Sequence, residues 1–284
     1  MKKKITFKGN EITLVGRGLK KGKPAPGFRA VNQQMQPVEL ADYKEKIKVI
    51  TSFLSLDTPV CDNQVKEFNQ RAVDMSEDVV VIGISNDLPF AQKRFCEMND
   101  IDNVDVLSDY KYSSFALNYG LMIKELNLVG RSVIILDKNG VIRYIEVVQE
   151  ATDTPDYDAA VEALDNVLKN PEKPIETTVA QRCKPCEGEV PSLKEDEISE
   201  QMKNISGWEL VDSRKIKKTL SFDDFKEAKF FLDLVAIVAE DQGHHPDLKL
   251  RYNKLDIELT THAADGLTEN DFIMAGVIDD ISSC

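Results

Sequence analysis

The amino-acid sequence predicts two domains of different fold class, an α/β domain followed by a smaller α+β domain. The chain has 284 residues, more than the usual length of one domain, roughly 100 to 150 residues. Strand-like and helix-like segments alternate in its first half, whereas strands come in consecutive pairs in its second half. A proline-rich stretch without hydrophobic periodicity separates the halves. We therefore expect domains over residues 1–169 and 191–284, joined by a linker over residues 170–190.

In the first domain, short β-branched runs indicate strands, and apolar residues at helical spacing indicate helices. The strands are expected over residues 48–54, 79–84, 104–107, 132–136 and 141–147, and the helices over residues 64–75, 90–98, 112–118 and 157–168. The dipeptide Asn139-Gly140 separates the last two strands, and Asn-Gly is a strong hairpin signal. This order predicts an α/β layer fold with a central mixed sheet.

The second domain is predicted to be a four-stranded antiparallel sheet with helices on one face. Its strands are expected over residues 208–211, 215–222, 248–252 and 255–259. Asp223 can cap a helix with an apolar stripe from Phe225 to Val238, and Thr268 can cap the last helix. Asn253-Lys254 is the expected turn of the second hairpin.

Composition excludes several classes of protein. The formal net charge of -13 disfavours nucleic-acid binding, because phosphate contacts need clustered lysine and arginine. No apolar stretch approaches the roughly 20 residues of a membrane span, and the basic N-terminus lacks the apolar segment of a secretory signal. Five cysteines, an odd number, argue against a disulfide-stapled scaffold. We expect a cytoplasmic protein that binds neither nucleic acid nor a membrane.

Cys61 is the first candidate for chemistry. It lies where the strand over residues 48–54 gives way to a helix beginning near Asp62, and a helix N-terminus favours the reactive thiolate. Thr58, three residues earlier, can donate a hydrogen bond to the sulfur or to a bound oxygen. The alternative for Cys61 is a buried structural cysteine, and Cys96 by itself is typical of a core thiol.

Residues 1 to about 168 resemble the bacterial thiol peroxidases, which are atypical 2-Cys peroxiredoxins with a thioredoxin-like fold. The segments that carry the resemblance are residues 22–28, 58–62, 94–96 and 130–132. The resemblance implies that Cys61 is the peroxidatic nucleophile, that Thr58 and Arg131 hold the peroxide oxygens and stabilise the thiolate, and that Cys96 is the resolving thiol. It further implies a Cys61 sulfenic acid, a Cys61–Cys96 disulfide and thioredoxin as the reductant, without a cofactor.

Leu54 departs from the pattern of that family, which has proline at this position. Leucine can still shield the site from water, but it does not fix φ as proline does. We therefore expect a less preorganised loop and slower turnover.

All three histidines, His244, His245 and His262, lie within nineteen positions. Clustered imidazoles suit general acid–base chemistry, because they titrate near neutral pH. Zinc binding and an inert surface pair are the alternatives, although adjacent histidines diverge on an extended backbone.

Residues 190–284 resemble the pterin-4a-carbinolamine dehydratases. The matching segments are residues 208–210, 243–247, 252–254, 261–262 and 266–271. The resemblance implies that His244 and His262 act as acid–base groups in the loss of water from 4a-hydroxytetrahydropterin, which gives quinonoid dihydropterin, while His245 helps to hold the pterin. Asp271 either orients a site histidine or is a solvated carboxylate. The alternative function for this domain is an oligomerisation or interaction module.

Cys183 and Cys186 form a Cys-x-x-Cys motif in the linker, without the second pair that a four-cysteine zinc site needs. An inert dithiol, a local disulfide or redox relay, and a half metal site shared between subunits all stay open. Cys284 is expected to be a free exposed thiol. Because both resembled families oligomerise, we expect a homodimer or higher homo-oligomer. The sequence as a whole predicts a bifunctional enzyme that takes a peroxide and a pterin as substrates.

Overall fold

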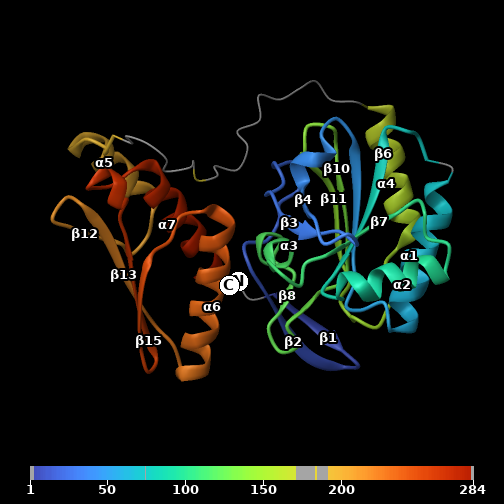
Figure 1. Ribbon diagram of the computed structural model, residues 1–284, viewed down its shortest axis with the longest axis horizontal. Coiled ribbons are helices and arrows are strands. Elements are labelled where there is room, and N and C mark those ends of the chain that lie inside the picture. Colours follow the sequence, from blue (N-terminus) through green and yellow to red (C-terminus); the bar gives the residue numbers. More distant parts are fainter. Residues whose placement is uncertain (1–2, 74, 171–182, 184–190, 283–284) are drawn as a thin grey trace. The chain divides into compact units, whose positions relative to one another are not determined.

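The computed structural model describes residues 3–73, 75–170, 183 and 191–282. The chain divides into two compact units, Met1–Ala180 and Gln181–Cys284, and Figure 1 shows helices and strands in each of them. Most of the segment 170–190 lies outside the described residues, as do Cys186 and Cys284.

A seven-stranded mixed sheet forms the core of the first unit (Figure 1). Its strands, in spatial order, are β11 (Ile142–Val147), β10 (Ser132–Leu136), β5 (Ile47–Ser52), β6 (Val79–Ser85), β7 (Asp105–Ser108), β3 (Arg29–Val31) and β4 (Pro37–Glu39). The central strands β5, β6 and β7 are parallel, and β10 is antiparallel to β5. Every residue of β5 is buried, as expected of a strand covered on both faces.

Helices and a second sheet complete this unit. The helices are α1 (Pro59–Ala72), α2 (Pro89–Met98), α3 (Ser114–Asn118), α4 (Tyr157–Lys169) and the short 3-10 helix Leu40–Tyr43. The second sheet has the order β1-β2-β8-β9, with strands Lys3–Phe7, Asn10–Val15, Met122–Ile123 and Leu128–Val129. Each strand and helix predicted for the first domain is present, with shifted ends. The N-terminal hairpin of β1 and β2 was not predicted.

The start of α1 differs from the prediction in a way that matters for Cys61. The helix begins at Pro59 rather than near Asp62, because Thr58 is the N-cap residue and its hydroxyl accepts the Cys61 N–H at 3.4 Å. Proline suits the first helical position, since its missing N–H would have no partner there. Cys61 is therefore the third residue of the helix rather than the residue before it.

The second unit contains an antiparallel sheet of four strands with the order β12-β13-β15-β14. The strands are β12 (Glu209–Val211), β13 (Lys215–Ser221), β14 (Asp247–Arg251) and β15 (Lys254–Leu259), and the helices are α5 (Glu195–Gln201), α6 (Phe225–Gln242) and α7 (Glu269–Ser282), with short 3-10 helices over Met202–Asn204 and His262–Ala264. The helices α6 and α7 pack against β15 and against each other. The order of elements agrees with the predicted α+β fold, apart from the additional α5.

Two local predictions for this unit were wrong by one residue. Asp224, not Asp223, caps α6, because its carboxylate accepts the Glu227 N–H at 2.9 Å. The hairpin turn consists of Tyr252 and Asn253, since Arg251 pairs with Lys254 across the two strands. Within the described ranges, no helix is long and apolar enough to cross a membrane.

Candidate active sites

The peroxidatic candidate Cys61 lies in the first turn of α1, after the carboxyl end of β5. Its side chain is fully buried. Because the N–H groups of a first helical turn carry the positive end of the helix dipole, this position favours an anionic sulfur.

Arg131, which immediately precedes the neighbouring strand β10, contacts the Cys61 sulfur. Ser132 pairs with Ser52 in the antiparallel register of β10 and β5, so the preceding Arg131 lies beside the end of β5. Its Nη2 is 3.3 Å from the Sγ of Cys61. A guanidinium keeps its proton in proteins, so the sulfur has a permanent positive charge beside it.

The guanidinium of Arg131 is itself held by two groups of the fold, which accept three hydrogen bonds from it. It is 1% exposed. Both Nε and Nη2 donate to the carbonyl oxygen of Ala151, each at 3.1 Å, and Nη1 donates to the Oε1 of Gln64. Gln64 lies one helical turn after Cys61, on the same face of α1. The bonds to Ala151 and Gln64 therefore fix the guanidinium so that its Nη2 lies against the sulfur.

The Thr58 hydroxyl does not donate to the sulfur, as the sequence suggested it could. Its proton goes to the carbonyl oxygen of Ser55 at 3.1 Å, and its oxygen accepts the Cys61 N–H. Thr58 therefore presents a hydrogen-bond acceptor to any group that binds next to the sulfur.

Cys96 lies on α2 and is 7% exposed. The Nε2 of Gln33 donates a hydrogen bond to its Sγ at 3.2 Å. Burial raises the pKa of the Cys96 thiol, and the hydrogen bond from Gln33 acts in the opposite direction. Cys61 and Cys96 are both free thiols in the structure, each with a different partner.

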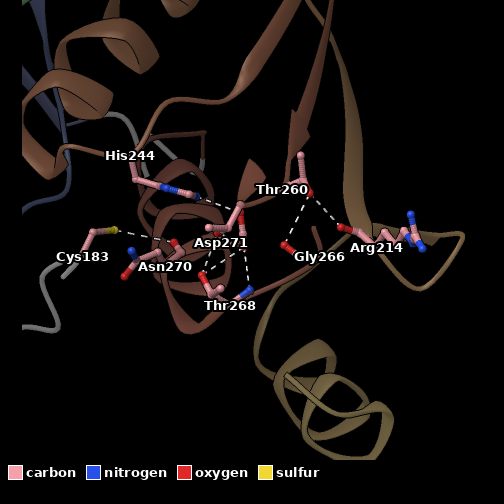
Figure 2. Close-up of polar contacts among 9 residues, drawn as sticks. Cys183, Arg214, His244, Thr260, Gly266, Thr268, Asn270 and Asp271 are labelled. Atoms are coloured by element: carbon pink, nitrogen blue, oxygen red, sulfur yellow. Dashed lines mark hydrogen bonds and ion pairs between the residues drawn. The ribbon is translucent and has the colours of Figure 1, made fainter. Parts of the chain in front are cut away.

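In the second unit, His244 and Asp271 form a buried pair (Figure 2). His244 follows Gly243, which ends α6 in the left-handed conformation with φ of 65°, and Asp271 lies in the first turn of α7. The His244 Nε2 and the Asp271 Oδ1 are 2.8 Å apart. Asp271 also accepts the Thr268 N–H at 2.7 Å and the Thr261 hydroxyl at 2.8 Å. Asp271 is thus buried and hydrogen-bonded to His244, and it is not the solvated carboxylate of the alternative.

The other two histidines lie at the same end of the β14–β15 pair. His245 precedes β14 and His262 follows β15, which runs antiparallel to it. The side chain of His245 is 60% exposed, and its Nε2 is 3.1 Å from the Oε1 of Glu240. His262 is exposed and lines a cavity of about 340 Å³ together with charged residues, among them Arg214 and Glu258.

Cys183 is a buried cysteine that contacts α6 and α7, and Figure 2 shows its contact with Asn270 in α7. Its N–H donates to the Oε1 of Gln242 in α6 at 3.2 Å, and its Sγ donates to the carbonyl of Asn270 in α7 at 3.6 Å. Cys186, the other half of the motif, lies outside the described residues. In the part of the chain that the structure describes, no group of three or more histidine, cysteine or carboxylate side chains is arranged to hold a metal ion.

Comparison with known proteins places the first unit in a family. Residues 20–161, half of the chain, match the family model described as Redoxin. The thiol peroxidase of Staphylococcus saprophyticus is 47% identical over 163 residues, which cover 57% of this chain and 98% of that protein. The chain belongs to the thiol peroxidase family. The thiol peroxidase of Bacillus subtilis is 46% identical over 165 residues, covering 58% of this chain and 98% of that protein.

The crystal structure of a peroxiredoxin-like protein from Aquifex aeolicus is 40% identical to the thiol peroxidase domain, with a TM-score of 0.54. The match covers 57% of this chain and 96% of that one, and it confirms the thioredoxin-like peroxiredoxin fold. Residues 191–281 match the family model described as Pterin 4 alpha carbinolamine dehydratase. A thiol peroxidase domain is therefore followed by a pterin carbinolamine dehydratase domain.

Proposed function

We propose that the protein is a bifunctional enzyme, a thioredoxin-dependent peroxidase and a pterin-4a-carbinolamine dehydratase. The observation that carries the peroxidase is the 3.3 Å contact between the buried Arg131 guanidinium and the Cys61 sulfur at a helix N-terminus. This arrangement stabilises a thiolate and also offers N–H donors to the oxygen atoms of a peroxide.

The first step is attack of the Cys61 thiolate on the terminal oxygen of a hydroperoxide. The O–O bond breaks, Cys61 becomes a sulfenic acid, and the departing alkoxide or hydroxide takes a proton. Arg131 holds the negative charge as it moves from sulfur to oxygen, and Thr58 accepts the hydrogen bond of the peroxide O–H. Hydrogen peroxide and organic hydroperoxides share this reacting group.

The second step converts the sulfenic acid into a disulfide. The Cys96 thiol displaces the oxygen of the Cys61 sulfenic acid, which forms the Cys61–Cys96 disulfide and releases water. Thioredoxin then reduces this disulfide by thiol–disulfide exchange, so that two electrons pass from its dithiol to the two cysteines.

A thioredoxin-coupled peroxide assay tests these steps. Wild type is expected to oxidise thioredoxin, and both Cys61→Ser and Cys96→Ser are expected to lose turnover. Cys183→Ser tests the redox-relay alternative for the linker motif in the same assay, and an unchanged rate would speak against that relay. Full turnover in Cys61→Ser would contradict the assignment of the nucleophile.

For the dehydratase, the supporting observation is the buried His244–Asp271 pair at the end of the sheet where His245 and His262 also lie. Loss of the 4a-hydroxyl as water needs one group that protonates the leaving oxygen and one that accepts the N5 proton. We assign these acid–base roles to His244 and His262, with His244 oriented by Asp271, and we assign binding of the pterin to His245.

Dehydration of 4a-hydroxytetrahydropterin by wild type and by His244→Ala decides between this activity and the alternative of an interaction module. A large loss in His244→Ala is expected. Cys61→Ser is the matched control for this assay, because it inactivates only the peroxidase. Equal rates in wild type and His244→Ala would remove the dehydratase claim.

A further inference from the structure

Asp87 lies between the two elements that carry the thiols of the peroxidase domain. In the chain it precedes α2, the helix of Cys96, which begins at Pro89. In space its carboxylate reaches the loop before α1, where Oδ1 accepts the Ser55 hydroxyl at 2.7 Å and Oδ2 accepts the Leu56 N–H at 2.8 Å. Ser85, the last residue of β6, also donates to Oδ2, at 2.8 Å. One half-buried carboxylate therefore joins three parts of the domain: the loop of residues 53–58 before α1, here called the peroxidatic loop, the end of β6 and the start of α2.

Ser55 connects this carboxylate to Cys61. The carbonyl oxygen of Ser55 accepts both the N–H and the hydroxyl of Thr58, each at 3.1 Å. Thr58 in turn accepts the Cys61 N–H. A continuous chain of hydrogen bonds thus runs from Asp87 through Ser55 and Thr58 to the peroxidatic cysteine.

The residue before Ser55 explains why such an anchor is needed in this chain. Leu54 is buried, but it has no ring to fix its φ angle. The two residues that follow it are instead held by the Asp87 carboxylate, one through a side chain and one through the backbone.

Formation of the Cys61–Cys96 disulfide requires this arrangement to change. The Cys61 sulfur is in contact with Arg131 and the Cys96 sulfur with Gln33, and both cysteines are free and buried. A disulfide needs the two sulfurs at about 2.05 Å. The two sulfurs must therefore approach each other from their present contacts, and hydrogen bonds between the two elements that carry them oppose this movement.

We propose that Asp87 is a positioning residue that holds the peroxidatic loop and α2 together in the reduced protein, which favours the attack of Cys61 on peroxide and slows the arrival of Cys96. The inference rests on the proposed function, because it requires that Cys96 displaces the oxygen of the Cys61 sulfenic acid, as water, to form the disulfide. Loss of the carboxylate then changes two rates in opposite directions. A general loss of structure would not accelerate one productive step while it slows the other.

The test is a single-turnover experiment on the full chain with hydrogen peroxide. Acid quenching, alkylation of free thiols and mass spectrometry give the amounts of Cys61 thiol, sulfenic acid, sulfinic acid and disulfide with time. Asp87→Ala is expected to react about tenfold more slowly with peroxide and to form the disulfide about tenfold faster, since it loses three hydrogen bonds to a charged acceptor. It should also accumulate less sulfinic acid at high peroxide, because faster resolution leaves less sulfenic acid to be oxidised again.

Three further variants keep the test decisive if Asp87→Ala is unstable. Ser55→Ala removes one of the three bonds and should shift both rates in the same directions by smaller factors. Asp87→Asn keeps an acceptor for the Leu56 N–H and is expected to lie between Asp87→Ala and wild type. Asp57→Ala, an exposed aspartate of the same loop, is the control and should match wild type.

Opposite shifts of the two rates in Asp87→Ala or Ser55→Ala support the proposal. The proposal is overturned if both variants form the disulfide at the wild-type rate and accumulate the wild-type amount of sulfinic acid. It is also overturned if both the peroxide reaction and disulfide formation become slower. Absence of the Cys61–Cys96 disulfide in wild type would instead refute the proposed peroxidase mechanism, so the two failures are distinguishable.

Discussion

Replacing Arg131 with methionine is expected to slow the reaction of Cys61 with peroxide by about 10-fold to 150-fold. The reason is the single contact of Nη2 with the sulfur at 3.3 Å, made by a guanidinium that is 1% exposed. A hydrogen bond to a charged group contributes about 1.5–3 kcal/mol, and each 1.36 kcal/mol of barrier corresponds to a tenfold change in rate.

Lysine at position 131 separates the effect of the positive charge from that of the planar guanidinium geometry. It keeps a positive charge, but a single ammonium cannot reproduce the fork that binds Ala151, Gln64 and Cys61 together. Arg131→Lys is therefore expected to lie between wild type and Arg131→Met.

The assay is the second-order rate constant for loss of the Cys61 thiol, measured at several peroxide concentrations in the absence of thioredoxin. Thermal unfolding of each reduced variant establishes that it is folded. Arg143→Lys is the matched control, because Arg143 is also a poorly exposed arginine. It pairs at 2.5 Å with Asp137, which follows the end of β10 opposite to Arg131. A wild-type rate constant in folded Arg131→Met would refute the reasoning.

Three further predictions follow from hydrogen bonds of single side chains. Gln33→Leu removes the hydrogen bond that counteracts the raised pKa of Cys96. Disulfide formation should then slow severalfold at neutral pH, and the pH profile of its rate, measured from pH 6 to 10, should move to higher pH. An unmoved profile would contradict this role of Gln33. Asp271→Asn weakens a charge-assisted bond to His244, and we expect dehydration to fall about a hundredfold while peroxide reduction is unchanged. The Thr152 hydroxyl and the Gly9 N–H lower the pKa of Glu150 to about 2, so its ionised form stabilises the fold above pH 4.5 and this stabilisation is lost as the pH falls from 4.5 towards 2. Glu150→Gln should accordingly melt below wild type at pH 7, and the two melting temperatures should converge near pH 2.

The parts of the peroxidase site that sequence could predict are those that depend on local structure. Cys61 and Thr58 are three residues apart, so the N-terminus of one helix positions both. The register of two neighbouring strands brings Arg131 beside them, and the strands themselves were visible as β-branched runs.

The contacts that sequence could not predict join distant loops. Gln33 lies in a turn 63 residues before Cys96, and Asp87 lies 31 residues after Leu56. No periodic pattern specifies such pairs, because they depend on how two loops pack after the sheet has formed. The N-terminal hairpin was missed for a related reason, since its turn at Lys8-Gly9 has none of the strong turn dipeptides.

The direction of the Thr58 hydroxyl has a consequence for substrate selectivity. Since its proton is bound to the Ser55 carbonyl, Thr58 can only accept a hydrogen bond from a ligand beside the sulfur. A hydroperoxide brings an O–H that satisfies this acceptor, whereas a dialkyl peroxide brings none and would place two lone pairs against each other. We therefore expect di-tert-butyl peroxide to be refused and tert-butyl hydroperoxide to be accepted, although the two molecules present the same O–O bond.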